Sequence, residues 1–330
     1  MIVPIAVIAG RALQVVLAAG LVGWTALLGY FQLGAPWWQV FFAVIVALLL
    51  GLLVLLWRRH WRRVWIAMGL VLVGAGLWWS TLVPRADRDW KPEVAHGVTA
   101  EIGPDKVTLN NVRNFGWTSE TEADERWERR VVDPGAITSV DIILSVWDSP
   151  DIAHTLVSFG FDDGQHVVFS SEIRKERDEE FSSLGGFFRK FELVLIAADE
   201  RDIVRLRTDL RGEQVSLYPI TMEAGQRERL FLSFLELGND LDRAPRWYNT
   251  LTSNCTTVPY HLAAQLSDRV VFDPRVILSG RLPGYLRDIG VLRPDLTAEE
   301  VAARASLGRL GPALADGTEF SRRMRVKWDG

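Results

Sequence analysis

The sequence predicts an α+β domain preceded by three transmembrane helices. Residues 12–57 contain no Asp, Glu, Lys or Arg, whereas charge is dense and mixed from residue 85 onward. In the charged part, runs rich in β-branched and aromatic residues come first and helical periodicity follows them. The one cysteine of the 330-residue chain, Cys255, stands where a helix is expected to begin.

Three apolar runs of bilayer-spanning length make up most of residues 1–84. "LGAPWW" (33–38) supplies the Gly and Pro that interrupt a helix, and it leaves about twenty apolar residues on each side, the length that crosses a bilayer. A third run, residues 64–83, follows "WRRHWRR". A cleaved signal peptide is the alternative for the first run, but its only positive charge is Arg11 and no clear small-residue cleavage site follows.

Arginines between the second and third runs predict the orientation in the membrane. They are Arg58, Arg59, Arg62 and Arg63. Positively charged loops favour the cytoplasmic side, so the rest of the chain is expected to emerge on the outer side. The expected organisation is therefore a membrane anchor of three transmembrane helices, residues 1–84, and an outer domain, residues 85–330.

The outer domain is expected to place strands before helices, which is typical of an α+β fold. Expected strands cover residues 106–120, 139–147, 154–161, 166–174 and 190–198, and expected helices cover 221–241, the residues after Cys255, and 297–307. The segment 280–292 has amphipathic spacing, which suits ordinary packing or a place near the site. The basic tail at 321–328 suits contact with anionic headgroups or a disordered terminus. The net charge of −4 and the lack of a basic stripe argue against nucleic acid as a partner.

Two of the expected strands form a hairpin whose register follows from its apolar residues. Val157, Phe159 and Phe161 share a face of the first strand, and Val167, Phe169 and Ile173 share a face of the second. Facing both sets toward one core pairs Val157 with Phe169 and makes "DDG" (162–164) a three-residue turn. The same register places His154 opposite Glu172, on the face away from the aromatic core.

The setting of Cys255 favours a reactive thiol. Pro259 lacks a backbone N–H, so the following helix is expected to begin near Thr256 or Thr257, with a threonine as N-cap. At a helix N-terminus, unpaired N–H groups and the helix dipole stabilise a thiolate or an oxyanion. The alternative is that Cys255 is simply a small buried apolar residue.

A cysteine nucleophile needs a base, and the chain offers five histidines. His154 has the best expected geometry, because Glu172 across the hairpin would orient its imidazole. The other histidines fall in the arginine loop (His60), the link to the domain (His96), beside the hairpin turn (His166) and within the helix after the cysteine (His261). One Cys and scattered His give none of the usual metal-ligand spacings, so no metal or other cofactor is expected.

Three segments resemble signature segments of the Lnb-type N-terminal periplasmic domain family. They are "WYNTLTSNCTTVPYH" (247–261), "NNVRNFGW" (110–117) and "AHTLVSFGFDDGQHVVFSSEIRKE" (153–176), within a likeness that covers most of residues 89–292. The resemblance implies a permuted papain-like fold, in which the His strand precedes the Cys helix. It also implies lipid chemistry, since Lnb moves a fatty acyl chain from the glyceryl group of a diacylated lipoprotein to the amino group of its terminal cysteine.

The resemblance implies that Cys255 takes the acyl chain as a thioester and that His154 serves as general base and then acid. Glu172 as the orienting group is inferred from the hairpin register. Three further residues are candidate substrate contacts: Asn254 for the oxyanion, and Arg174 or Arg113 for a phosphate or carboxylate. Each arginine suits a structural ion pair equally well.

The expected location is the bacterial inner membrane, with multiple spans and the C-terminal domain in the periplasm. The expected partners are the lipid bilayer and, as substrate, a membrane lipid or a lipoprotein N-terminus. The anchor precedes the domain here, whereas most of the membrane part of the family's namesake follows it. Two alternatives to the acyltransferase therefore stay open: a membrane-tethered cysteine hydrolase for a lipid ester or cell-wall peptide bond, and a non-catalytic envelope binding module.

Overall fold

The computed structural model describes residues 5–34, 36–57, 60–311 and 317–328. The chain divides into two compact units. They are Met1–Pro84 with Phe181–Lys190, and Arg85–Glu180 with Phe191–Gly330. The assignment of Phe181–Lys190 to the first unit is a feature that the sequence analysis does not anticipate.

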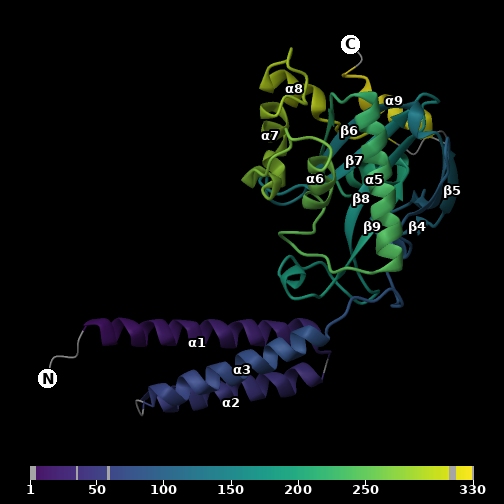
Figure 1. Ribbon diagram of the computed structural model, residues 1–330. Helices are drawn as coiled ribbons and strands as arrows, with labels where there is room; N and C mark the ends of the chain where they lie inside the picture. Colours follow the sequence, from purple (N-terminus) through teal and green to yellow (C-terminus); the bar gives the residue numbers. More distant parts are fainter. Residues whose placement is uncertain (1–4, 35, 58–59, 312–316, 329–330) are drawn as a thin grey trace. The chain divides into compact units, whose positions relative to one another are not determined.

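Apolar helices make up most of the first unit (Figure 1). They are α1 (Ile5–Gln32), α2 (Trp37–Trp57) and α3 (Trp61–Thr81). In the described residues, two stretches are long and apolar enough to cross a membrane, Ala9–Gln32 and Trp61–Thr81. The described apolar stretch of α2, Trp37–Leu52, is shorter than the about 20 residues that a span needs. The prediction of three transmembrane helices is therefore corrected to two candidate spans.

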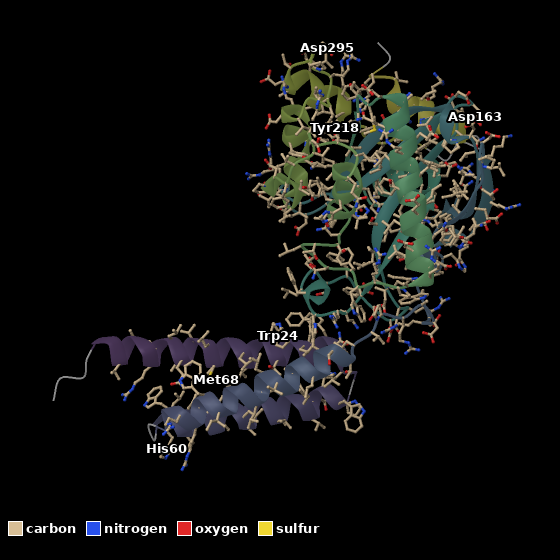
Figure 2. The ribbon with its side chains drawn as sticks, in the orientation of Figure 1. Trp24, His60, Met68, Asp163, Tyr218 and Asp295 are labelled. Carbon is tan, nitrogen blue, oxygen red and sulfur yellow. The ribbon has the colours of Figure 1, made fainter. Side chains whose placement is uncertain are left out.

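Only some of the arginines that predict the orientation in the membrane lie in the described residues. Arg58 and Arg59 lie outside the described residues, as does Ala35 in the turn after α1. Buried side chains from all three helices pack together, and Met68 of α3 is among them (Figure 2). The helices thus form a small apolar core of their own.

The segment Phe181–Lys190 is fastened to the ends of these helices. The Gln32 side-chain amide donates to the carbonyls of Phe188 and Arg189, at 2.6 and 2.9 Å. Arg189 in turn donates to the carbonyl of Trp79 at 2.8 Å, and its guanidinium lies 4.5 Å from the Trp79 ring centroid. The last carbonyls of a helix lack partners within the helix, so an arginine there satisfies one of them and suits the helix dipole.

One large sheet organises the second unit (Figure 1). Among the described residues its strand order is β1-β2-β9-β8-β7-β6-β10, with β5 paired to β2, and β3 and β4 form a separate two-stranded sheet. Neighbouring strands are antiparallel except β2 and β9. The strands are β1 (Thr99–Ile102), β2 (Val107–Arg113), β3 (Gly116–Trp117), β4 (Ala123–Asp124), β5 (Trp127–Val132), β6 (Ile137–Val146), β7 (His154–Phe161), β8 (His166–Arg174), β9 (Glu192–Ala198) and β10 (Gln214–Pro219).

Helices flank this sheet, and the mixture confirms the α+β prediction. The helices are α4 (Glu200–Arg205), α5 (Ala224–Arg243), α6 (Thr257–Ala264), α7 (Leu282–Asp288), α8 (Ala298–Ala305) and α9 (Gly317–Arg325). The long helix α5 crosses one face of the sheet (Figure 1). There Phe159 of β7 and Phe169 of β8 pack against Phe231 and Phe234, and the Phe169 and Phe234 rings stack with centroids 4.9 Å apart. These rings are the aromatic core that sets the hairpin register.

The basic C-terminal segment is a docked helix rather than a disordered terminus. Phe320, Met324 and Trp328 are buried. Arg325 pairs with two buried carboxylates, Asp141 of β6 and Glu200 of α4, at 2.7 and 2.6 Å. The alternative of a disordered terminus at residues 321–328 is therefore wrong, because the apolar residues between the basic ones pack into the domain. Contact of this segment with anionic headgroups stays a prediction.

Candidate active site

The hairpin β7–β8 has the register that its apolar residues predict. Val157 pairs with Phe169, and the strands turn through residues 162–164. Gly164 closes the turn with φ +83°, a backbone conformation that favours glycine. Asp163, within the turn, lies at the edge of the domain (Figure 2). The opposite end of the hairpin carries His154, the first residue of β7.

His154 meets Glu172 across the hairpin, as predicted. Its Nε2 atom lies 3.1 Å from Oε1 of Glu172 and 2.8 Å from the Ser170 hydroxyl. Ser170 donates to the same Glu172 oxygen at 2.7 Å, and Arg207 donates to it at 3.4 Å. One carboxylate oxygen thus orients the imidazole while two further donors hold that oxygen in place.

Cys255 lies at the start of α6, which begins at Thr257 with Thr256 as its N-cap residue, as predicted. Its Sγ atom is 3.9 Å from the carbonyl oxygen of Ala153, the residue before His154, and 3.8 Å from the Thr256 hydroxyl. The thiol and the imidazole therefore come from adjoining positions, one at the start of a helix and one at the start of a strand.

The Asn254 side chain performs the helix capping. Its Oδ1 accepts from the backbone N–H groups of Thr256 and Thr257, both at 2.8 Å, and its Nδ2 donates to the carbonyl of Thr250 at 2.7 Å. Two N–H groups of the helix start are thereby satisfied by Asn254. The structure thus places the amide expected at an oxyanion in a structural role that fixes the backbone on both sides of Cys255.

The electrostatics of the site favour a thiolate beside an imidazolium. Burial lowers the pKa of His154, but the Glu172 and Cys255 charges outweigh burial and raise this pKa to about 9. Burial raises the pKa of the Cys255 thiol, but the charge and hydrogen bond of His154, together with hydrogen bonds to Thr155 and Thr256, bring it below its ordinary value. Burial also opposes ionisation of Glu172, and His154 and Arg207 outweigh it, so the pKa of Glu172 is strongly lowered.

Three further residues of this site are ones that sequence reasoning missed. Ser170 lies two residues before Glu172 on the same strand, so period-2 alternation could have placed it on the His154 face. Arg207 follows α4, and no local pattern connects it with the hairpin. Burial and the charges of Cys255 and Glu172 raise the pKa of Tyr248 strongly, so this residue stays a neutral phenol.

The two arginine candidates lie in structural networks instead. Arg113 forms a buried ion pair with Asp202 at 2.8 Å, and Asp202 also accepts from Trp117 Nε1. Arg174 donates to the carbonyl of Ala95 at 2.6 Å, and its guanidinium lies 4.6 Å from the Trp90 ring centroid. The structure therefore does not bring either side chain to His154. In the described part of the chain, no group of three His, Cys, Asp or Glu side chains is arranged to hold a metal ion.

The fold and the site define an α+β domain with a Cys–His–Glu arrangement, in a chain that also carries apolar helices of membrane-spanning length. Residues 123–280 match the family model described as the Lnb N-terminal periplasmic domain, so this part of the chain is similar to that family. The matched residues include His154, Glu172 and Cys255, and they confirm the family resemblance over a narrower range than residues 89–292. No curated protein and no solved structure matches the chain. The chain is a membrane-anchored, Lnb-like protein with a periplasmic domain.

Proposed function

We propose that this protein is a membrane-anchored periplasmic cysteine acyltransferase. The observation that carries the proposal is the arrangement of the Cys255 thiol, the His154 imidazole and the Glu172 carboxylate. A lowered thiol pKa, a base beside the thiol and a third group that orients the base are what covalent acyl transfer requires. The order of the His strand β7 before the Cys helix α6 supports a permuted papain-like fold.

In the proposed mechanism each nitrogen of His154 has its own role. Nε2 is engaged by Ser170 and Glu172, so the proton of the Cys255 thiol passes to Nδ1. The thiolate attacks the carbonyl carbon of an acyl ester, the C–S bond forms, the C–O bond breaks, and His154 gives its proton to the departing alcohol. An amine then attacks the thioester, gives a proton to His154 and restores the thiolate as the C–S bond breaks.

The Glu172 carboxylate keeps the His154 imidazole in position throughout this reaction cycle. Glu172 remains ionised because His154 and Arg207 stabilise its charge. An ionised carboxylate on Nε2 holds the imidazole in one orientation and stabilises the imidazolium. The backbone N–H of Thr155 and the hydroxyl of Thr256, which hydrogen-bond with Cys255, support the charged form of the thiol.

A mass-spectrometric assay tests the proposal. The full-length protein in detergent is incubated with a synthetic diacylated lipopeptide, and the masses of protein and peptide are measured in the same run. We expect an acyl adduct on wild type, an N-acylated peptide that has lost one ester-linked chain, and neither with Cys255→Ala. His154→Ala should slow adduct formation about 10²–10⁴-fold, as expected for loss of a general base.

His261→Ala is the matched control, because His261 is an exposed histidine on α6, the helix that follows Cys255. It should leave the adduct rate unchanged. An adduct that decays to free fatty acid, with the peptide amine unmodified, would indicate a cysteine hydrolase. No adduct on wild type, with Cys255 also unreactive toward alkylating agents, would indicate a binding module.

A further inference from the structure

An apolar cavity of about 100 Å³ lies beside the candidate active site. Its walls come from β6, β7, α5, α6 and the segment around α7. Ala263 of α6 and Leu286 of α7 are among the lining residues. The amphipathic segment 280–292 thus has a role that its sequence left open, because its apolar side chains close one side of the cavity.

Two threonines connect the cavity with the thiol. Thr155 and Thr256 both line the cavity, and they directly follow His154 and Cys255 in the chain. Their hydroxyls hydrogen-bond to each other at 2.7 Å, and the Thr256 hydroxyl lies 3.8 Å from Sγ of Cys255. Because the two hydroxyls hydrogen-bond to each other, the cavity wall nearest the thiol presents few polar groups that require a water molecule. A pocket with such an apolar lining offers water few partners and favours apolar ligands.

We propose that this cavity holds a hydrocarbon segment of the group carried on Cys255, and that Ala263 and Leu286 set how much of it is accommodated. The proposal rests on the proposed function for the identity of that group as an acyl chain. An apolar cavity of ~150 Å³ takes a benzene molecule. The smaller cavity here therefore takes a few carbons of a chain rather than a whole lipid.

Alkyl methanethiosulfonates test the cavity without requiring acyl transfer. They react with a thiolate to form a mixed disulfide: the new S–S bond forms as the S–SO₂ bond breaks, and methanesulfinate leaves. Because the chain has one cysteine, every disulfide adduct is on Cys255. The measurement is the adduct rate of the full-length protein in detergent with methyl, butyl and octyl reagents, followed by intact mass.

The wild-type rate should rise with chain length, about fourfold for each methylene that enters the cavity, which corresponds to about 0.8 kcal/mol. Ala263→Phe should remove this gain, so that the octyl rate falls much more than the methyl rate. Ala264→Phe is the matched control, because Ala264 is the next residue of α6 and does not line the cavity. Comparing the two variants cancels partitioning of the longer reagents into detergent. Leu286→Ala enlarges the cavity and should extend the gain to longer chains, which keeps the test decisive if Ala263→Phe fails to fold.

The proposal would be overturned if the adduct rate of wild type did not change with chain length. It would also be overturned if Ala263→Phe lowered the methyl and octyl adduct rates equally while Leu286→Ala left the octyl rate unchanged. A parallel series with p-nitrophenyl acetate, butyrate and octanoate separates this proposal from the proposed function. Chain-dependent disulfide formation without any ester acylation would refute acyl transfer while the cavity assignment stands. Ester acylation of Cys255 at a rate independent of chain length would refute the cavity assignment while acyl transfer stands.

Discussion

Glu172 controls the charge of His154 through one oxygen atom. That oxygen accepts from His154, Ser170 and Arg207, so the carboxylate is both ionised and fixed in position. A carboxylate on one ring nitrogen favours the imidazolium, and the imidazolium in turn favours the Cys255 thiolate. We therefore expect the reactivity of the Cys255 thiol to depend on Glu172, through His154.

Glu172→Gln should shift the pH dependence of Cys255 alkylation. Removing the carboxylate removes the largest influence that raises the pKa of His154, so this pKa falls from about 9. Less imidazolium then faces the thiol, and the pKa of Cys255 rises. The thiolate fraction at a given pH below the new midpoint therefore falls. The measurement is the iodoacetamide rate against pH, whose midpoint should move upward in the variant.

Glu180→Gln is the matched control for this experiment, since Glu180 is an exposed glutamate that pairs with Lys91 at 3.4 Å. Its alkylation profile should coincide with that of wild type. If Glu172→Gln also kept the wild-type midpoint, Glu172 would not act on His154, and the carboxylate would have to be assigned a purely structural role.

Helix α6 positions Cys255 through its cap. Asn254 Oδ1 accepts hydrogen bonds from the first two backbone N–H groups after Cys255. The backbone that carries the thiol is therefore fixed in position. Asn254→Ala should cost about 0.5–2 kcal/mol of stability, the usual effect of losing such a cap. Asn254→Asp should keep most of that stability, because a carboxylate caps a helix N-terminus well.

The aspartate variant also separates capping from direct action on an oxyanion. Its negative charge beside Cys255 should raise the pKa of the thiol and slow alkylation at pH 7, while acylation at saturating pH recovers. Thermal unfolding and alkylation rates of both variants provide the measurement. Loss of acylation at every pH in Asn254→Asp, with unchanged stability, would instead indicate that the Asn254 amide donates to the reacting oxygen.

Local chemistry explains which parts of the site the sequence could predict. The hairpin register followed from two apolar sets with period 2, and the start of α6 followed from Pro259 and the threonines. Arg207 could not be predicted, because tertiary packing brings it to Glu172 from a segment 35 residues away. The strand β5 was missed because it is partly exposed and rich in charge, which weakens the alternation that identifies strands.

Long-range ion pairs hold the C-terminal helix to the rest of the domain. Arg325 of α9 reaches Asp141 on β6 and Glu200 on α4, and all three groups are largely buried. Burial opposes ionisation of Glu200, but the Arg325 charge outweighs it and lowers the pKa of Glu200 to about 2. A buried carboxylate whose cation is removed is left with its full desolvation cost.

Arg325→Met should therefore destabilise the domain by about 3–5 kcal/mol near neutral pH, the range for breaking a buried pair. The pKa of Glu200 in the folded protein lies below its unfolded value, so its contribution to stability is present above about pH 4.5 and declines as pH falls toward 2. Wild type should lose stability over this window. The variant should lose less, or gain, because protonation relieves its unpaired Glu200 carboxylate.

The measurement is the thermal unfolding midpoint of the full-length protein between pH 7 and pH 3. Arg322→Met is the matched control on the same helix, since Arg322 pairs with Glu319 at 2.8 Å on the surface. Exposed pairs contribute about 0–1 kcal/mol, so this variant should follow the wild-type curve. A parallel decline of wild type and Arg325→Met on acidification would show that the Arg325 pairs do not set the acid stability of the domain, and that its C-terminal helix is held by the buried Phe320, Met324 and Trp328 alone.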